Sequence, residues 1–100
     1  MGVNEIRSLI EGSAAELRAA GLSALYLFGS QARGEGRDGS DIDLAFDVAP
    51  EANEKFNLLD QAGLQIRLQE LLGRKVDFLE RRAIHRDLRP RIERDLVRLL

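Results

Sequence analysis

Residues 41–48 alternate between large apolar side chains and small or acidic ones, and this period constrains the fold more than any other stretch. The apolar members are Ile42, Leu44, Phe46 and Val48. Because successive side chains of a β-strand point to opposite faces, the two-residue period predicts a strand that is buried on one face only. Pro50 follows and ends the strand, since proline has no backbone N–H to donate to a neighbour.

Two shorter runs predict further strands. Residues 24–28 are mostly apolar and end at Gly29, and residues 75–79 read Lys-Val-Asp-Phe-Leu. Residues 30–33 have the composition of a short helical turn entered from a tight corner. The glycine-rich stretch 34–39 then predicts a mobile loop.

Helical spacing of apolar residues predicts three helices around these strands. The first covers residues 3–20 and stops near Gly21, and the second covers residues 51–72 and is closed by Gly73. Pro90 opens the third, because proline is tolerated in the first turn of a helix. The side chains expected to face the core are Phe56, Leu59 and Ile66 in the second helix and Ile92, Leu96, Leu99 and Leu100 in the third.

The composition predicts one small domain spanning residues 1–100. The chain is 44% hydrophobic and 32% charged, enough for one core but not for a separate substrate domain. No apolar run approaches the roughly 18 residues of a membrane span, and the first residues lack the pattern of a signal peptide. We therefore expect a cytoplasmic protein with no membrane partner. There is no cysteine, so any metal would be bound mainly by oxygen ligands.

The charge is unevenly distributed. The formal net charge is only -2, yet residues 81–100 contain seven arginines against three acidic residues. Two interpretations stay open for this basic tail: a solvated helix face with intrahelical ion pairs, or a surface for a partner or a nucleic acid. Nucleic acid is the less favoured partner.

Three aspartates form the candidate catalytic and metal site. Asp41 and Asp43 lie two residues apart on one strand, so they share a face about 6.6 to 7 Å apart at the backbone. Asp77 lies between two apolar residues of the next strand, and pairing of the strands would bring it beside them. Divalent cations offset the repulsion of such a cluster, and all-oxygen ligation suits two Mg²⁺ ions, or Mn²⁺ in their place.

Gly29 and Ser30 supply a candidate phosphate site. Gly29 has no side chain, so a triphosphate can approach its backbone, while the Ser30 hydroxyl and the following amides can donate to phosphate oxygens. Arg33 either contacts phosphate or braces the loop against an acid such as Asp41 or Asp43.

Three other polar residues have ordinary explanations. Asp47 shares the face of the aspartate pair but lies further along the strand, so we predict a solvated strand end rather than a ligand. His85 has no nucleophile in an identifiable motif, which favours a surface or capping role. Tyr26 is expected to pack within the first strand.

The run from Leu25 to Gly34 (LYLFGSQARG), followed by Ser40 to Leu44 (SDIDL), resembles the signature of the minimal nucleotidyltransferases of the DNA polymerase beta-like superfamily. The resemblance extends from about Leu25 to Leu79. It implies a small α/β fold, in which a short mixed sheet carries helices mainly on one face and the acidic site on the open face. It also assigns nucleotide phosphates to Gly29 and Ser30, metals to the first two aspartates, and activation of the incoming hydroxyl to the third.

Small members of that family serve as antitoxins to HEPN-domain ribonuclease toxins. The resemblance therefore implies transfer of AMP from ATP to a hydroxyl group, most plausibly a tyrosine, of a HEPN toxin. Phosphate and metal ligands do not distinguish ATP from other nucleoside triphosphates. Two alternatives remain at this point: an antitoxin that acts by binding and occlusion alone, and transfer to the hydroxyl of a small molecule.

Overall fold

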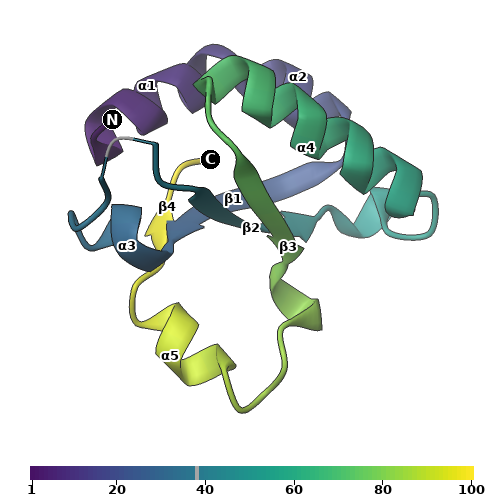
Figure 1. Cartoon of the computed structure of the whole chain (residues 1–100). Coiled ribbons are helices and arrows are strands. Elements are labelled where there is room, and N and C mark those ends of the chain that lie inside the picture. Colours follow the sequence, from purple (N-terminus) through teal and green to yellow (C-terminus); the bar gives the residue numbers. More distant parts are fainter. Residues whose placement is uncertain (38) are drawn as a thin grey trace.

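The computed structural model describes residues 1–37 and 39–100; Asp38, in the predicted loop, lies outside the described residues. Within the described part of the chain, four strands form one mixed sheet in the order β3-β2-β1-β4 (Figure 1). The elements are α1 (Val3–Gly12), α2 (Ala14–Ala19), β1 (Leu22–Phe28), α3 (Gly29–Ala32), β2 (Ile42–Val48), η1 (Pro50–Ala52), α4 (Leu58–Leu72), β3 (Val76–Glu80), η2 (Arg81–Ala83), α5 (Arg89–Glu93) and β4 (Val97–Arg98).

The strand directions are mixed, as the family resemblance implied. β1 runs antiparallel to both β2 and β4, whereas β2 and β3 are parallel. The antiparallel β1–β2 pair is joined through α3 and the loop that follows it, and the parallel pair is joined through α4, which provides the crossover that parallel strands need. The C-terminal end of β1 and the N-terminal ends of β2 and β3, which carry the candidate site residues, therefore lie side by side at the same end of the strands.

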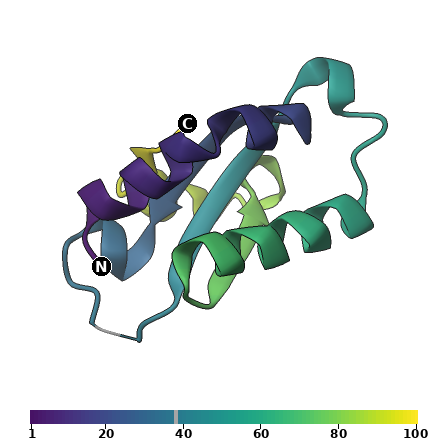
Figure 2. The same ribbon diagram turned by 90° about the horizontal axis from the view of Figure 1, so that it is seen from above.

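The longer helices cover one face of the sheet, which confirms the predicted arrangement. Figures 1 and 2 show α1, α2 and α4 side by side above the strands, while α5 lies on the opposite side. Phe46 of β2 is fully buried beneath these helices, and its ring stacks on Phe78 of β3 with a centroid distance of 4.3 Å. No helix in the described residues is long and apolar enough to cross a membrane.

The second predicted helix begins later than expected. Residues 50–52 form a short 3-10 helix, and α4 starts only after Asn57, whose side chain accepts hydrogen bonds from the backbone N–H groups of Leu59 and Asp60. Asp60 in turn accepts from the N–H of Asn57, so a capping box fixes this start. The buried side chains of α4 are Leu64, Leu68 and Leu72; Leu59 and Ile66, predicted to face the core, are exposed.

The two ends of the chain also differ from the prediction. The expected helix over residues 3–20 is divided at Ser13 into α1 and α2. The helix at Pro90 ends at Glu93, and the chain then extends to pair Val97 with Leu27 of β1. Leu99 directly follows β4 and is buried there, and not in the predicted helical stripe.

α4 seals the free edge of β3 with glutamines spaced one helical turn apart. Gln61 donates to the carbonyl of Phe78 at 3.1 Å, and Gln65 donates to the carbonyl of Val76 at 2.8 Å. The side-chain oxygen of Gln69 accepts from the N–H of Val76 at 3.1 Å. These bonds occupy backbone groups that an edge strand otherwise offers to another chain.

Candidate active site

The corner between β1 and α3 depends on Gly29. Its φ angle of +74° lies in the left-handed region, where a side chain is strained. A Cβ atom at this position would also overlap a carboxylate oxygen of Asp43. The backbone of the Gly-Ser corner therefore lies directly against Asp43, which brings the predicted phosphate site and one predicted carboxylate together.

The parallel pairing of β2 with β3 places Asp43 directly opposite Asp77. The two carboxyl groups lie within hydrogen-bonding reach of each other, which favours the protonated form of Asp43. Burial has the largest effect on the pKa of Asp43, and together with Asp77 and the charge of Asp41 it raises that pKa to about 6. The predicted pairing of these two carboxylates is confirmed.

Asp41 precedes β2, which begins at Ile42, so the ladder does not fix its direction as the sequence predicted. Its carboxylate lies 3.8 Å from the ammonium of Lys75, although its charge still acts on Asp43. Among residues 1–37 and 39–100, no group of three or more histidine, cysteine, aspartate or glutamate side chains is arranged so that it could bind one metal ion.

The chemistry of the site nevertheless fits a divalent cation. The neighbouring carboxylates raise the pKa of Asp43, and a divalent cation would offset the same repulsion. Asp43 and Asp77 are hard oxygen donors of the kind that Mg²⁺ accepts. They would form the centre of the metal site, and the metal-binding role of all three aspartates stays a prediction.

Arg33 is braced by acids other than those predicted. Its Nε donates to Glu35 and its Nη1 donates to Asp95, each at 3.0 Å. Asp95 lies between α5 and β4, so this ion pair connects the segment that follows the Gly29–Ser30 corner to the C-terminal segment. The positive charge of Arg33 also lowers the pKa of Asp43, which opposes the larger effects that raise it.

Ser30 and Gln31 shape the start of the loop. The carbonyl of Ser30 accepts a hydrogen bond from the N–H of Glu35 at 2.8 Å, which folds the loop back on α3. Gln31 is only 5% exposed, and a Cβ atom at Gly36 would overlap its amide. Sequence reasoning missed Gln31; the glycine at position 36 was the signal that a side chain packs against the loop.

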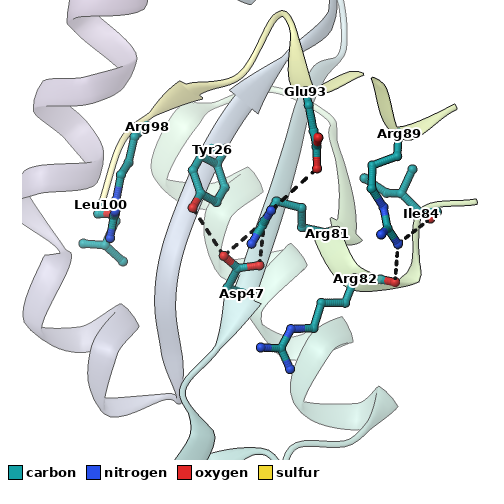
Figure 3. A network of polar contacts seen from close by, with 9 residues as sticks. All are labelled: Tyr26, Asp47, Arg81, Arg82, Ile84, Arg89, Glu93, Arg98 and Leu100. Atoms are coloured by element: carbon teal, nitrogen blue, oxygen red, sulfur yellow. Dashed lines mark hydrogen bonds and ion pairs between the residues drawn. The ribbon is translucent and has the colours of Figure 1, made fainter. Parts of the chain in front are cut away.

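Asp47 is not the solvated strand end that the sequence predicted. Its carboxylate accepts hydrogen bonds from Arg81 at 2.9 Å and from the hydroxyl of Tyr26 at 3.3 Å (Figure 3). The Arg81 guanidinium lies 5.5 Å from the centre of the Tyr26 ring, and it also pairs with Glu93 at 3.7 Å. This network fixes Tyr26 and the start of η2 on the open face of the sheet.

His85 has the surface role predicted for it. Its side chain is 67% exposed, and its Nδ1 accepts a hydrogen bond from the backbone N–H of Asp87 at 3.2 Å. It therefore caps a turn in the segment between η2 and α5, away from the aspartates.

Comparison with known proteins agrees with this geometry. Residues 10–100 match the family of nucleotidyltransferase domains. The Methanocaldococcus jannaschii protein named Putative protein adenylyltransferase MJ0435 is 37% identical to this chain over 100 residues, which cover the whole of both sequences.

Solved structures with the same fold include two informative cases. One, described as a putative minimal nucleotidyltransferase, has a TM-score of 0.80 and 33% identity, and the match covers 97% of this chain and 95% of the other. The second is a toxin-antitoxin crystal structure with AMP-PNP, with a TM-score of 0.73 and 25% identity, covering 94% of this chain and 72% of the other.

Proposed function

Because this chain belongs to the family of nucleotidyltransferase domains, we propose that it transfers AMP from ATP to a hydroxyl group of a partner protein. The observation that carries the proposal is the contact of the Asp43–Asp77 pair with the Gly29 corner. If the Gly29 corner binds phosphate, the pair of carboxylates lies directly beside it, as attack on a phosphate requires. The similarity to a protein named as an adenylyltransferase supports a protein acceptor.

The phosphate corner positions the nucleotide. Gly29 leaves its backbone open to a phosphate, and the hydroxyl of Ser30 donates to a phosphate oxygen. Arg33 adds a positive charge near the same corner and contacts phosphate after exchanging one of its carboxylate partners. These three residues hold the triphosphate with its α-phosphorus toward Asp43 and Asp77.

One member of the carboxylate pair accepts the proton of the attacking hydroxyl. The acceptor oxygen attacks the α-phosphorus, its bond to phosphorus forms, and the bond from that phosphorus to the bridging oxygen breaks to release pyrophosphate. Asp77 takes the proton of the attacking hydroxyl as a general base. Asp41, Asp43 and Asp77 would hold two Mg²⁺ ions, or Mn²⁺, which neutralise the charge of the triphosphate when bound.

The partner that fits best is a HEPN-domain toxin that accepts AMP on a tyrosine. The family resemblance of the LYLFGSQARG and SDIDL runs supports this choice, as does the similarity to an antitoxin crystallised with AMP-PNP. Modification of the toxin would silence it, and the chain would act as the antitoxin in the cytoplasm.

The test uses ATP labelled at the α or the γ phosphate, Mg²⁺, the purified chain and the HEPN toxin of the same cells. We expect label in the toxin from the α position only, and at least a hundredfold slower transfer by Asp43→Asn. Asp87→Asn, an identical change at an exposed turn, is the matched control and should transfer at the wild-type rate. Transfer by Asp43→Asn at the wild-type rate would overturn the proposal.

A second candidate is an antitoxin that acts by occlusion alone, for which the exposed arginines of residues 81–98 offer a binding surface. It predicts normal silencing of the toxin by the Asp41→Asn, Asp43→Asn double variant and loss of silencing when the exposed Arg91 and Arg94 are both replaced by glutamate. Silencing and label measured in the same samples separate the two candidates.

A further inference from the structure

The open face of the sheet changes character one step beyond the aspartates. Asp77 and Leu79 are two residues apart in β3 and share this face. Asp77 pairs with Asp43 and Leu79 pairs with Ala45, so an apolar row follows the acidic row. A protein that approaches Asp77 along β3 therefore passes its neighbouring side chains over Leu79.

Leu79 forms one wall of an apolar hollow of about 400 Å³. The hollow reaches around the end of β3 to the first turn of α4, and its lining is Leu58, Gln61, Leu79, Glu80, Ala83 and Ile84. Leu58 is 81% exposed and Leu79 is 43% exposed. Two solvent-exposed leucines that line a hollow of this size are typical of a site that a partner covers.

The wall opposite α4 is held by hydrogen bonds from Arg89 and carries positive charge on its outside. Arg89 donates to the carbonyls of Arg82 and Ile84 at 3.1 and 3.2 Å, which fixes the segment that lines the hollow. Arg82 and Arg86 lie within two residues of Ile84 and are exposed. In Figure 3 the Arg82 side chain points away from the network that holds Arg81.

We propose that this hollow is the docking site for the acceptor protein, which inserts an apolar side chain next to its acceptor hydroxyl and faces Arg82 and Arg86 with acidic residues. The proposal rests on the proposed function, because that function places the acceptor hydroxyl at Asp77. Leu79 belongs to both the catalytic strand and the hollow, so docking there aligns the hydroxyl with Asp77. Glu80, the acidic member of the lining, is half-buried, whereas Arg82 and Arg86 are exposed.

The experiment measures the affinity of the full chain for the HEPN toxin by calorimetry, without ATP, so that binding is read apart from transfer. Leu58→Ser is compared with Leu59→Ser, because the two neighbours are 81% and 83% exposed and only Leu58 lines the hollow. We expect Leu58→Ser and Leu79→Ser each to weaken binding at least tenfold, as truncation of a central apolar contact does. Leu59→Ser should bind as the wild type does.

Two further measurements define the partner's chemistry. The Arg82→Glu, Arg86→Glu variant should weaken binding, and the loss should shrink as salt is raised. The affinity for AMP-PNP with Mg²⁺ should be unchanged in all of these variants. A thermal melt of each variant confirms that it is folded.

The outcomes separate this inference from the proposed function. Binding that depends on Leu58 and Leu79 without any transfer supports the docking site and overturns the proposed function. Transfer by a wild type whose affinity for the toxin equals that of both leucine variants overturns the docking site alone. Weaker AMP-PNP binding by the leucine variants would overturn it too, since the hollow would then hold the nucleotide base. A wild type that does not bind the toxin overturns it directly.

Discussion

The two faces of the sheet are built from the same strands but differ in role: one forms the core, and the other carries the polar residues of the candidate site. On the covered face, Ile42, Leu44 and Phe46 are fully buried against the helices. On the open face, the intervening Asp43 and Asp47 make the carboxylate pair and the Tyr26–Arg81 network. Alternation along one strand therefore provides stability from every second residue and leaves the others available for chemistry.

The open face lowers the stability of the fold where Asp43 lies against Asp77. Packing on the covered face is apolar and needs no partner from outside, whereas on the open face Asp43 lies against Asp77 and has a raised pKa. Repulsion of this kind lowers stability above the raised pKa and is relieved only by a proton, a cation or a neutral substitute. Removal of a buried side chain on the covered face should consequently lower stability, whereas neutralisation of Asp43 on the open face should raise it.

The largest effect is expected from Phe46→Ala on the covered face. The ring of Phe46 contacts those of Phe78 and Phe56, at centroid distances of 4.3 and 5.6 Å. Its removal should lower the free energy of unfolding by about 3 to 5 kcal/mol, measured by urea denaturation. Leu79→Ala on the open face is the control and should cost less than about 1 kcal/mol. Equal losses at the two positions would remove the distinction between the faces.

A smaller effect with the opposite sign is expected from Asp43→Asn. The folded pKa of Asp43 is raised from 3.8 to about 6, so the folded state binds more protons than the unfolded state between these values. The wild type should therefore lose stability as the pH rises from about 4 to about 6, and the penalty should be complete above that window. Without Mg²⁺, Asp43→Asn should melt at a higher temperature than the wild type at pH 7.5.

The difference between the two melting curves isolates Asp43 from other titrating groups. It should be small near pH 4, grow up to about pH 6 and then stay constant. A variant that is less stable than the wild type at pH 7.5 would show that Asp43 contributes a structural hydrogen bond that outweighs the repulsion. The same substitution thus stabilises the fold and stops the proposed transfer.

Much of the candidate site could be predicted from the sequence, because it depends on residues that are close together in the chain. The period of β2 set the faces of Asp43 and Asp47, and Gly29 marked a corner that a side chain cannot occupy. The start of α4 was also encoded locally: Asn57 and Asp60 have the spacing of a capping box, a signal that outweighs the apolar pattern extending back to residue 51.

The rest depends on contacts between residues far apart in the chain. Asp47 appeared solvated because its partner Arg81 lies 34 residues later. The C-terminal residues read as a helix, yet Val97 and Arg98 gain more from pairing with β1 than from a short isolated helix. Local periodicity does not report such pairing, so β4 and the brace on Arg33 emerged only from the fold.

The smallest effect is expected from Asp95→Asn, which removes that brace. The Arg33–Asp95 pair is short, at 3.0 Å, but both side chains reach solvent, so its loss should leave the free energy of unfolding nearly unchanged. Nucleotide binding should respond more clearly, because Arg33 is then freer to contact phosphate. We expect Asp95→Asn to bind AMP-PNP more tightly in calorimetry, with Glu93→Gln as the matched control because Glu93 contacts Arg81 instead. Weaker binding by Asp95→Asn would contradict this expectation. It would mean that the ion pair with Asp95 holds Arg33 in the position that binds phosphate.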